Sequence, residues 1–307
     1  MKGCTVGGVT LPHGPYMIGA GACKTPALTK MWLKVAPAVS GSYTPDGGSG
    51  NPGNVLFPDT LEELISLGAG NNSLGMPNMG YAHAKAELAS IEAKQPMIVS
   101  IAGFKPADYW LGVETFQTMK NVAAIELNKG CPNKQEEHTG DIMSFDPIAV
   151  RQTLEGLSAR GVTKPLWLKF SPYSNPNELM RMAFIVNEFR HELNLTVVTC
   201  NTFANSYMPK AKLTPNKGRA GLSGPAMKYI ALGQVHQFRE YLDPIIDVVS
   251  SGGHMTGDDI MDSLEAGAKA VELTSLAYWG GTPDVFFEHL MNQETSSRFI
   301  KHLTDDI

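Results

Sequence analysis

Short apolar segments recur along the whole chain, and most of them are rich in β-branched residues. Few alternate with polar residues, which is typical of strands buried on both faces of a parallel sheet. The pattern predicts strands at residues 16–18, 35–39, 97–101, 124–127, 166–170, 196–200, 245–249 and 270–273.

Helical patterns lie between many of these segments, most clearly at 147–159, 176–193, 226–242 and 256–266. Alternation of strand and helix with short connections indicates βαβ units. The number of units favours an α/β fold of the (βα)8 or TIM barrel type, with residues 1–307 as a single domain. We expect the Gly-, Pro- and Ser-rich stretch 40–58 to be one long loop over the active face.

A doubly wound open sheet is the alternative fold. The segment GAGACK at 19–24 holds part of a nucleotide-binding glycine pattern, but no acidic residue ends a clear second strand. A lone G-x-G is a weak signal, and an ordinary turn explains it as well.

The composition makes several classes of function less favoured. The net charge of −5 and the sequence pI of about 5.9 give no support to a nucleic-acid partner. No run of apolar residues is long enough to span a membrane, and no signal peptide is evident at the start, so we expect a cytoplasmic protein. The four cysteines are far apart, which predicts reduced thiols and no metal site.

Polar residues stand where several predicted strands end. In a barrel the loops that follow the strands form the functional face, so these residues should share one rim. They are Asn128, Lys169, Asn201 with Thr202, 250–253, and Thr274 with Ser275.

Three glycine-rich turns on this face favour a bound phosphate. SSGG at 250–253 follows one buried strand, Thr274 and Ser275 follow the next, and AGLSGPAM at 220–227 gives a third approach. Glycine lets the backbone come close to an anion, and the loops after the last two strands of a barrel often hold phosphate. Plain turn glycines are the alternative, but three such loops in succession favour a phosphate-bearing cofactor.

Cys131 differs from the other cysteines because it follows a strand and lies in a polar loop, within NKGCPN at 128–133. Cys4, Cys23 and Cys200 are expected to be small buried hydrophobic residues. Asn128 and Asn133 offer uncharged donors and acceptors that suit a flat polar ring. From these residues alone, Cys131 is as consistent with a structural role as with a nucleophile or a proton-transfer base.

The chain also contains NSLGMPNMG at 72–80, LWLKFSP at 166–172, CNTFAN at 200–205 and the region 251–276. Together with NKGCPN, these segments resemble the dihydroorotate dehydrogenase family of flavin-dependent barrels. NKGCPN resembles its N-x-S-C-P-N segment and NSLGMPNMG at 72–80 its N-S-[ML]-G-L-P-N-x-G loop. LWLKFSP at 166–172, CNTFAN at 200–205 and 251–276 resemble its lysine strand, its sixth strand end and its flavin-phosphate region. The similarity runs in register over nearly the whole chain.

The resemblance implies FMN as cofactor and oxidation of dihydroorotate to orotate in pyrimidine biosynthesis. Cys131 would take a proton from C5 of the substrate while hydride leaves C6 for the flavin. The residues implied to bind substrate are Asn72, Leu74, Gly75, Met76, Asn128, Asn133, Asn201 and Thr202. Those implied to bind FMN are Ala20, Gly21, Asn128, Lys169, Gly224, Ser250, Gly252, Gly253, Thr274 and Ser275.

The closest class of the family works as a homodimer and commonly uses fumarate as acceptor, so both are expected here. The chain departs from the family at three places. Gly41 stands where a lysine is usual, and Lys129 is a conceivable substitute although its neighbour Asn128 should take the opposite face. Gly130 replaces a serine, and the loop 134–143 is longer and more acidic. Two alternatives therefore stay open: an FMN oxidoreductase of another small cyclic substrate such as a dihydropyrimidine, and a non-catalytic barrel that binds flavin or a metabolite.

Overall fold

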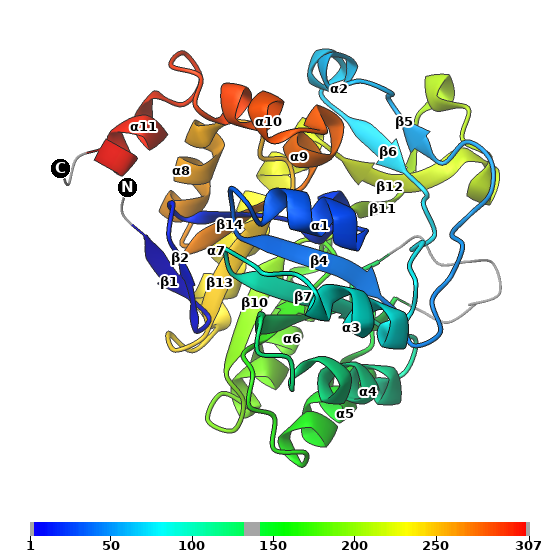
Figure 1. The fold of residues 1–307 in the computed structure, drawn as a ribbon, viewed down its shortest axis with the longest axis vertical. Helices are drawn as coiled ribbons and strands as arrows, with labels where there is room; N and C mark the ends of the chain where they lie inside the picture. Colours follow the sequence, from blue (N-terminus) through cyan, green and yellow to red (C-terminus); the bar gives the residue numbers. More distant parts are fainter. Residues whose placement is uncertain (1–2, 132–141, 305–307) are drawn as a thin grey trace.

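Eight parallel strands close into a barrel with helices around it (Figure 1). The computed structural model describes residues 3–131 and 142–304. The barrel strands are β3 (Tyr16–Ile18), β4 (Ala38–Tyr43), β7 (Met97–Ala102), β8 (Val122–Asn128), β9 (Leu166–Lys169), β10 (Leu195–Thr199), β13 (Asp247–Ser251) and β14 (Ala270–Leu273). The predicted (βα)8 barrel is confirmed, and the open sheet is excluded because β14 pairs with β3.

The helices that surround the barrel begin at capping residues that can be read from the sequence. Five of them start with proline directly after the N-cap residue, as in α5, where the carboxylate of Asp146 accepts from two backbone N–H groups of the first turn. The helices are α1 (Pro26–Trp32), α2 (Leu61–Leu67), α3 (Tyr81–Ala89), α4 (Pro106–Phe116), α5 (Pro147–Ser158), α6 (Pro176–Glu188), α7 (Lys228–Tyr241), α8 (Gly257–Glu265), α9 (Ser275–Gly280), α10 (Pro283–Leu290) and α11 (Ser297–Thr304).

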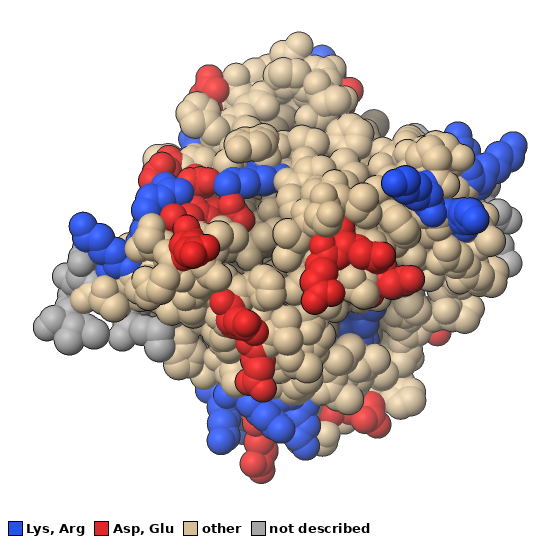
Figure 2. Space-filling view, turned by 90° about the horizontal axis from the view of Figure 1, so that it is seen from above, with Lys and Arg blue, Asp and Glu red and all other residues tan. Residues whose placement is uncertain are grey.

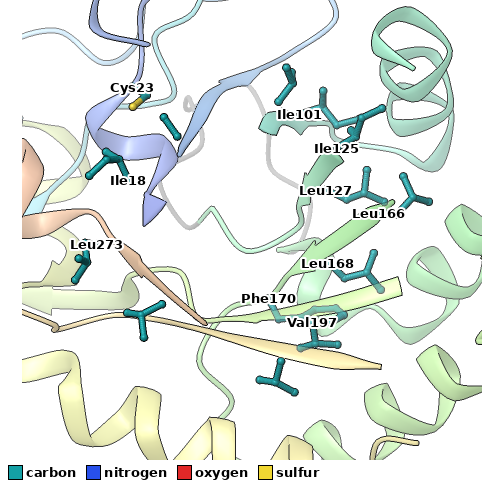
Figure 3. Close-up of a cluster of buried hydrophobic side chains, with 14 of the residues drawn as sticks. Ile18, Cys23, Ile101, Ile125, Leu127, Leu166, Leu168, Phe170, Val197 and Leu273 are labelled. Carbon is teal, nitrogen blue, oxygen red and sulfur yellow. The ribbon is translucent and has the colours of Figure 1, made fainter. Parts of the chain in front are cut away.

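Side chains alternate between two apolar layers along each barrel strand. The outer layer packs against the helices, and Figure 3 shows part of it, including Ile125 and Leu168. The inner layer fills the barrel and includes Val39, Trp167 and Val249. Because strand side chains alternate, a residue two positions beyond an inner one also faces the interior. This rule decides which polar residues reach the site.

A two-stranded hairpin closes the end of the barrel opposite the strand carboxyl ends. It consists of β1 (Cys4–Val6) and β2 (Val9–Leu11), and its residues Val6, Val9 and Leu11 join the inner core. Trp167 anchors it, since its indole N–H donates to the Gly7 carbonyl at 3.4 Å. The interior is therefore packed rather than hollow.

A second, four-stranded antiparallel sheet was not predicted. It joins β11 (Phe203–Tyr207), β12 (Arg219–Ser223), β6 (Gly70–Asn72) and β5 (Leu56–Phe57), which come from two separate connections, β4 to β7 and β10 to β13 (Figure 1). The expectation of one loop over 40–58 was wrong: β4 extends to Tyr43, and Leu56 and Phe57 pair with β6. These strands are short and partly polar, so hydrophobic periodicity did not reveal them.

Charged side chains form several small groups on the face drawn in Figure 2, and most of that face is uncharged. No helix among the described residues is both long and apolar enough to cross a membrane.

Candidate active site

A cleft of about 1100 Å³, including its open mouth, lies at the carboxyl ends of the barrel strands. Its size suits a cofactor together with a small substrate. The residues predicted as functional that line it are Ala20, Gly21, Asn72, Leu74, Gly75, Met76, Asn128, Cys131, Lys169, Asn201, Thr202, Gly224, Gly252, Gly253, Thr274 and Ser275. Residues far apart in the sequence are thus brought together around one space.

Two predicted residues stand apart from this set. Ser250 does not line the cleft, because strand alternation turns its side chain outwards to His254 and Ser263, 3.2 and 3.1 Å away. Ser251 lines the cleft in its place. Asn133 lies outside the described residues, as does most of the loop 134–143.

Neutral amides and hydroxyls form a connected group beside the thiol. Asn201 Nδ2 donates to Asn128 Oδ1 at 2.9 Å, and Asn128 Nδ2 donates to Ser42 Oγ at 2.8 Å. The backbone N–H of Gly130 also donates to Asn128 Oδ1, at 3.2 Å. These bonds fix which way the Asn128 amide faces, so its orientation is set before any ligand enters.

Just before Cys131, the backbone at Gly130 passes close to the backbone at Phe170 and Ser171, directly after β9. A Cβ at Gly130 would lie 2.6 Å from the Ser171 backbone nitrogen, and the Gly130 carbonyl accepts from Ser171 Oγ at 3.0 Å. Glycine at 130 therefore lets the chain pass close to β9 and carry the half-buried Cys131 to the cleft. The departure from the family serine has a steric cause.

Three ionisable side chains lie in the barrel interior beneath the amides. Lys169 forms ion pairs with Glu272 and, at 3.6 Å, with Glu126. Burial, followed by the Glu272 charge, raises the pKa of Glu126 to about 8. Lys169, despite its burial, has its pKa raised by these carboxylates, and so it carries its charge beside the cleft.

Lys129 does not enter the cleft, so its proposed role as a substitute for the missing lysine was wrong. Its ammonium lies 3.8 Å from the centre of the Tyr109 ring and 3.2 Å from Thr153 Oγ1, on the outer face of the barrel. Burial there lowers the pKa of Lys129 to about 7. As the alternation rule required, Asn128 and Lys129 take opposite faces.

Lys24 supplies a cation that the sequence analysis missed. It follows β3, lines the cleft, and is adjacent to Cys23, whose carbonyl accepts from Gly41 N at 3.0 Å. Burial lowers the pKa of Lys24, and the Cys131 side chain acts in the opposite direction. The cleft therefore holds a lysine next to position 41 although position 41 is glycine.

Gly41 itself has no room for a side chain. Its φ is +119°, and a Cβ there would lie 2.5 Å from the Ser100 carbonyl oxygen. The left-handed conformation and this contact both select glycine.

Glycines form a close-fitting backbone wall at the other end of the cleft. A Cβ at Gly21 would lie 2.5 Å from Thr274 Cγ2, and one at Gly253 would lie 2.2 Å from the Lys228 backbone nitrogen. Gly252 and Gly253 have φ values of +122° and +84°. Such a wall presents backbone groups rather than side chains, which fits a phosphate and a flat ring.

A family profile described as Dihydroorotate dehydrogenase matches residues 4–293. The chain belongs to the dihydroorotate dehydrogenase family. The prediction of an oxidoreductase of this family is thereby confirmed.

Relatives within the family are named for two different electron acceptors. A protein assigned as dihydroorotate dehydrogenase A (fumarate) of Streptococcus uberis is 26% identical over 265 residues, covering 83% of this chain and 80% of the relative. The dihydroorotate dehydrogenase B (NAD(+)) catalytic subunit of Listeria monocytogenes is 31% identical over 239 residues, covering 77% and 74%.

A solved structure supports the fold. The dihydroorotate dehydrogenase of Eimeria tenella, crystallised in complex with ferulenol, superposes with a TM-score of 0.77 at 18% identity, covering 99% of this chain and 84% of that chain.

Sequence reasoning missed several residues that line the cleft. Ser42 could have been found by the strand-end rule that selected Asn128, had the second strand been placed correctly. Lys24 comes well after the end of β3, beyond the turn at Ala20–Ala22, so that rule did not select it. Glu272 is a charged residue inside an apolar strand, and that signal was available beside Lys169. Within 3–131 and 142–304, no group of three His, Cys, Asp or Glu side chains could hold a metal ion.

Proposed function

We propose that this protein oxidises dihydroorotate to orotate with a bound FMN, and that Cys131 is the base. The observation that carries the proposal is that a cysteine, neutral amides, a buried lysine and a glycine wall line one cleft. Membership of the dihydroorotate dehydrogenase family supports the same reaction.

FMN fits the residues on one side of the cleft. The backbone at Ala20, Gly21 and the turns at 252–253 and 274–275 would hold its ring and phosphate, while Lys169 would face the polar edge of the ring. When bound, FMN supplies an acceptor for the two electrons and the hydrogen that leave the substrate. A cation at that edge stabilises negative charge that develops there.

The amides on the other side suit a pyrimidine ring. Asn72, Asn128, Asn201 and Thr202 offer both donors and acceptors without charge, which matches the alternating C=O and N–H edges of dihydroorotate. Asn133, outside the described residues, would complete this set. The Cys131 side chain, in its thiolate form, can take the C5 proton and become a thiol once the ring is held against it.

Lys24 gives the substrate carboxylate a partner. It lines the cleft near position 41, and the backbone at 74–76 lies in the same space. An ammonium and backbone N–H groups bind a carboxylate through charge-assisted hydrogen bonds. Lys24 would take the place of the lysine that is usual at position 41. Its charge favours binding of dihydroorotate, which has a carboxylate, over a neutral dihydropyrimidine.

Anaerobic half-reactions test the proposal. Purified protein should be yellow and should bleach when dihydroorotate is added without oxygen. A yellow protein that ignores dihydroorotate but is reduced by a neutral dihydropyrimidine would establish the second candidate, which Gly41 favours. A colourless protein that takes up no FMN on titration would contradict both and favour a binding role.

The acceptor and the oligomer remain predictions. The resemblance implies fumarate and a homodimer, and a steady-state assay with fumarate or NAD together with light scattering of the protein would check them.

A further inference from the structure

Two buried carboxylates share one ammonium beneath the cleft. Glu126, Glu272 and Lys169 are 0%, 1% and 6% exposed, and they come from β8, β14 and β9. A buried charge needs a partner, and one lysine can neutralise only one of the two glutamates. Charge balance therefore requires one further proton within the group.

The hydrogen bonds at the two carboxyl groups show where that proton would lie. Glu126 Oε1 accepts from Ser100 Oγ at 2.8 Å, and Glu272 Oε2 bonds to Lys169. Glu126 Oε2 and Glu272 Oε1 are buried, and no donor among residues 3–131 and 142–304 hydrogen-bonds to either, although Glu126 Oε2 forms the longer ion pair with Lys169 at 3.6 Å. The Glu126 and Glu272 side chains lie within hydrogen-bonding reach of each other. Two carboxyl groups with unfilled oxygens are satisfied when one donates a proton to the other.

In the part of the chain that the structure describes, no other ionisable group on the surrounding strands supplies the missing charge. The groups that face the triad are the thiols of Cys23, after β3, and Cys200, after β10. Burial raises the pKa of both thiols, that of Cys200 to about 12, so both stay neutral.

A line of hydroxyl groups connects the carboxylate pair with the cleft. Ser100 Oγ, the donor to Glu126, lies 2.7 Å from Ser42 Oγ in a second hydrogen bond. Ser42 lines the cleft and accepts from Asn128. Hydroxyls both donate and accept, so a proton can pass along them by breaking one O–H bond and forming the next, with no oxidant or reductant.

We propose that Glu126 and Glu272 hold one shared proton beside Lys169 and exchange it with the cleft through Ser100 and Ser42. This proton store lies at the floor of the cleft, which Lys169 and Glu272 both line, so it can balance charge that changes there during turnover. The shared proton requires neither FMN nor dihydroorotate. It can therefore be tested independently of the proposed function.

Infrared spectroscopy of the purified protein tests the shared proton. The carbonyl stretch of a protonated carboxylic acid is separate from carboxylate bands, and wild type should show one that is lost as the pH rises through about 8. Glu126→Gln should lack it, and so should Glu272→Gln, because the remaining glutamate then pairs with Lys169 alone. The exposed Glu294→Gln should keep it.

Absence of the band in wild type at every pH, or its persistence in both Gln variants, would overturn the proposal. Either Gln variant alone carries the test if the other fails to fold by circular dichroism.

Deuterium exchange tests the route. After transfer to D₂O the band shifts as its proton exchanges, and Ser100→Ala or Ser42→Ala should slow this shift several-fold while keeping the band. Ser40→Ala is the matched control, since Ser40 is on the same strand but bonds to Thr29 and Tyr43. Equal exchange rates in the Ser100 variant, the Ser42 variant and wild type would reject the serine route.

Discussion

Cys131 and Lys24 reach the same cleft from different strand ends, and each should contribute a separate part of the reaction. The thiol is expected to move the proton, and the ammonium is expected to hold the substrate carboxylate. Because the roles differ, single substitutions should separate chemistry from binding.

Cys131→Ala should lower the rate of dihydroorotate-dependent flavin reduction by roughly 10²- to 10⁴-fold, the usual contribution of a positioned base. FMN content should stay near that of wild type, because the glycine wall is untouched. Anaerobic stopped-flow absorbance measures both quantities. Cys4→Ala, at the far end of the barrel, is the control, and an unchanged rate in the Cys131 variant would remove it from the reaction.

Lys24→Met should raise the dissociation constant for dihydroorotate by roughly ten- to a hundredfold, because a charge-assisted hydrogen bond contributes about 1.5–3 kcal/mol. The same change is expected for orotate, which carries the same carboxylate, and titration of the FMN-loaded protein with orotate measures it. Lys30→Met, exposed on α1, should bind as wild type does. Equal affinity in the two variants would show that Lys24 does not meet the carboxylate.

At the scale of elements, the turns after β13 and β14 determine cofactor binding. Gly253→Ala should weaken FMN binding by roughly tenfold or more, since its Cβ would collide with the Lys228 backbone and its φ is +84°. Quenching of flavin fluorescence on titration gives the affinity. Gly233→Ala is the matched control, because nothing lies within 4 Å of its Cβ. Wild-type affinity in the Gly253 variant would place the phosphate elsewhere.

The start of α8 carries a pH-dependent contribution to stability. Burial opposes ionisation of Asp259, but hydrogen bonds from Lys228 and from the Met255 and Thr256 backbone outweigh it and lower its pKa. A lowered folded-state pKa stabilises the fold above the unfolded value of about 3.9, and this stabilisation is lost as the pH falls through the folded value.

Asp259→Asn should therefore lower the free energy of unfolding at neutral pH, and its difference from wild type should shrink in acid. Urea unfolding at neutral pH and at about pH 3 measures both. A difference that stays constant with pH would mean that packing, not charge, explains the loss.

On the scale of the whole molecule, the hairpin β1–β2 closes the base of the barrel and also adds apolar side chains to its inner core. Leu11→Ala should reduce the free energy of unfolding by about 2–5 kcal/mol, since Leu11 is 0% exposed within the inner layer. Ile148→Ala, at an exposed position, should change it by less than about 0.5 kcal/mol. Similar values for the two variants would mean that the hairpin is not part of the cooperative core.

The barrel could be predicted from the sequence because its strands are apolar on both faces and its helices begin at evident caps. Many of the residues that line the cleft could also be predicted, because the strand ends of a barrel meet at one rim. Lys24 and the carboxylate pair were missed since their importance depends on which strands are neighbours around a closed barrel. The small sheet was missed because its strands are short and polar, and Asn71 and Asn72 pair with residues that only the fold brings next to them.

That small sheet has a consequence for specificity. Asn72 sits on β6, between β12 and β5, whereas Asn128 ends a barrel strand. A ring bound between these two amides would therefore contact the small sheet, built from two linked connections, on one side and the barrel on the other. Substitutions in 219–223, although remote in sequence from Cys131, should change the distance between Asn72 and Asn128. They should thereby change the size of the substrate that the cleft admits.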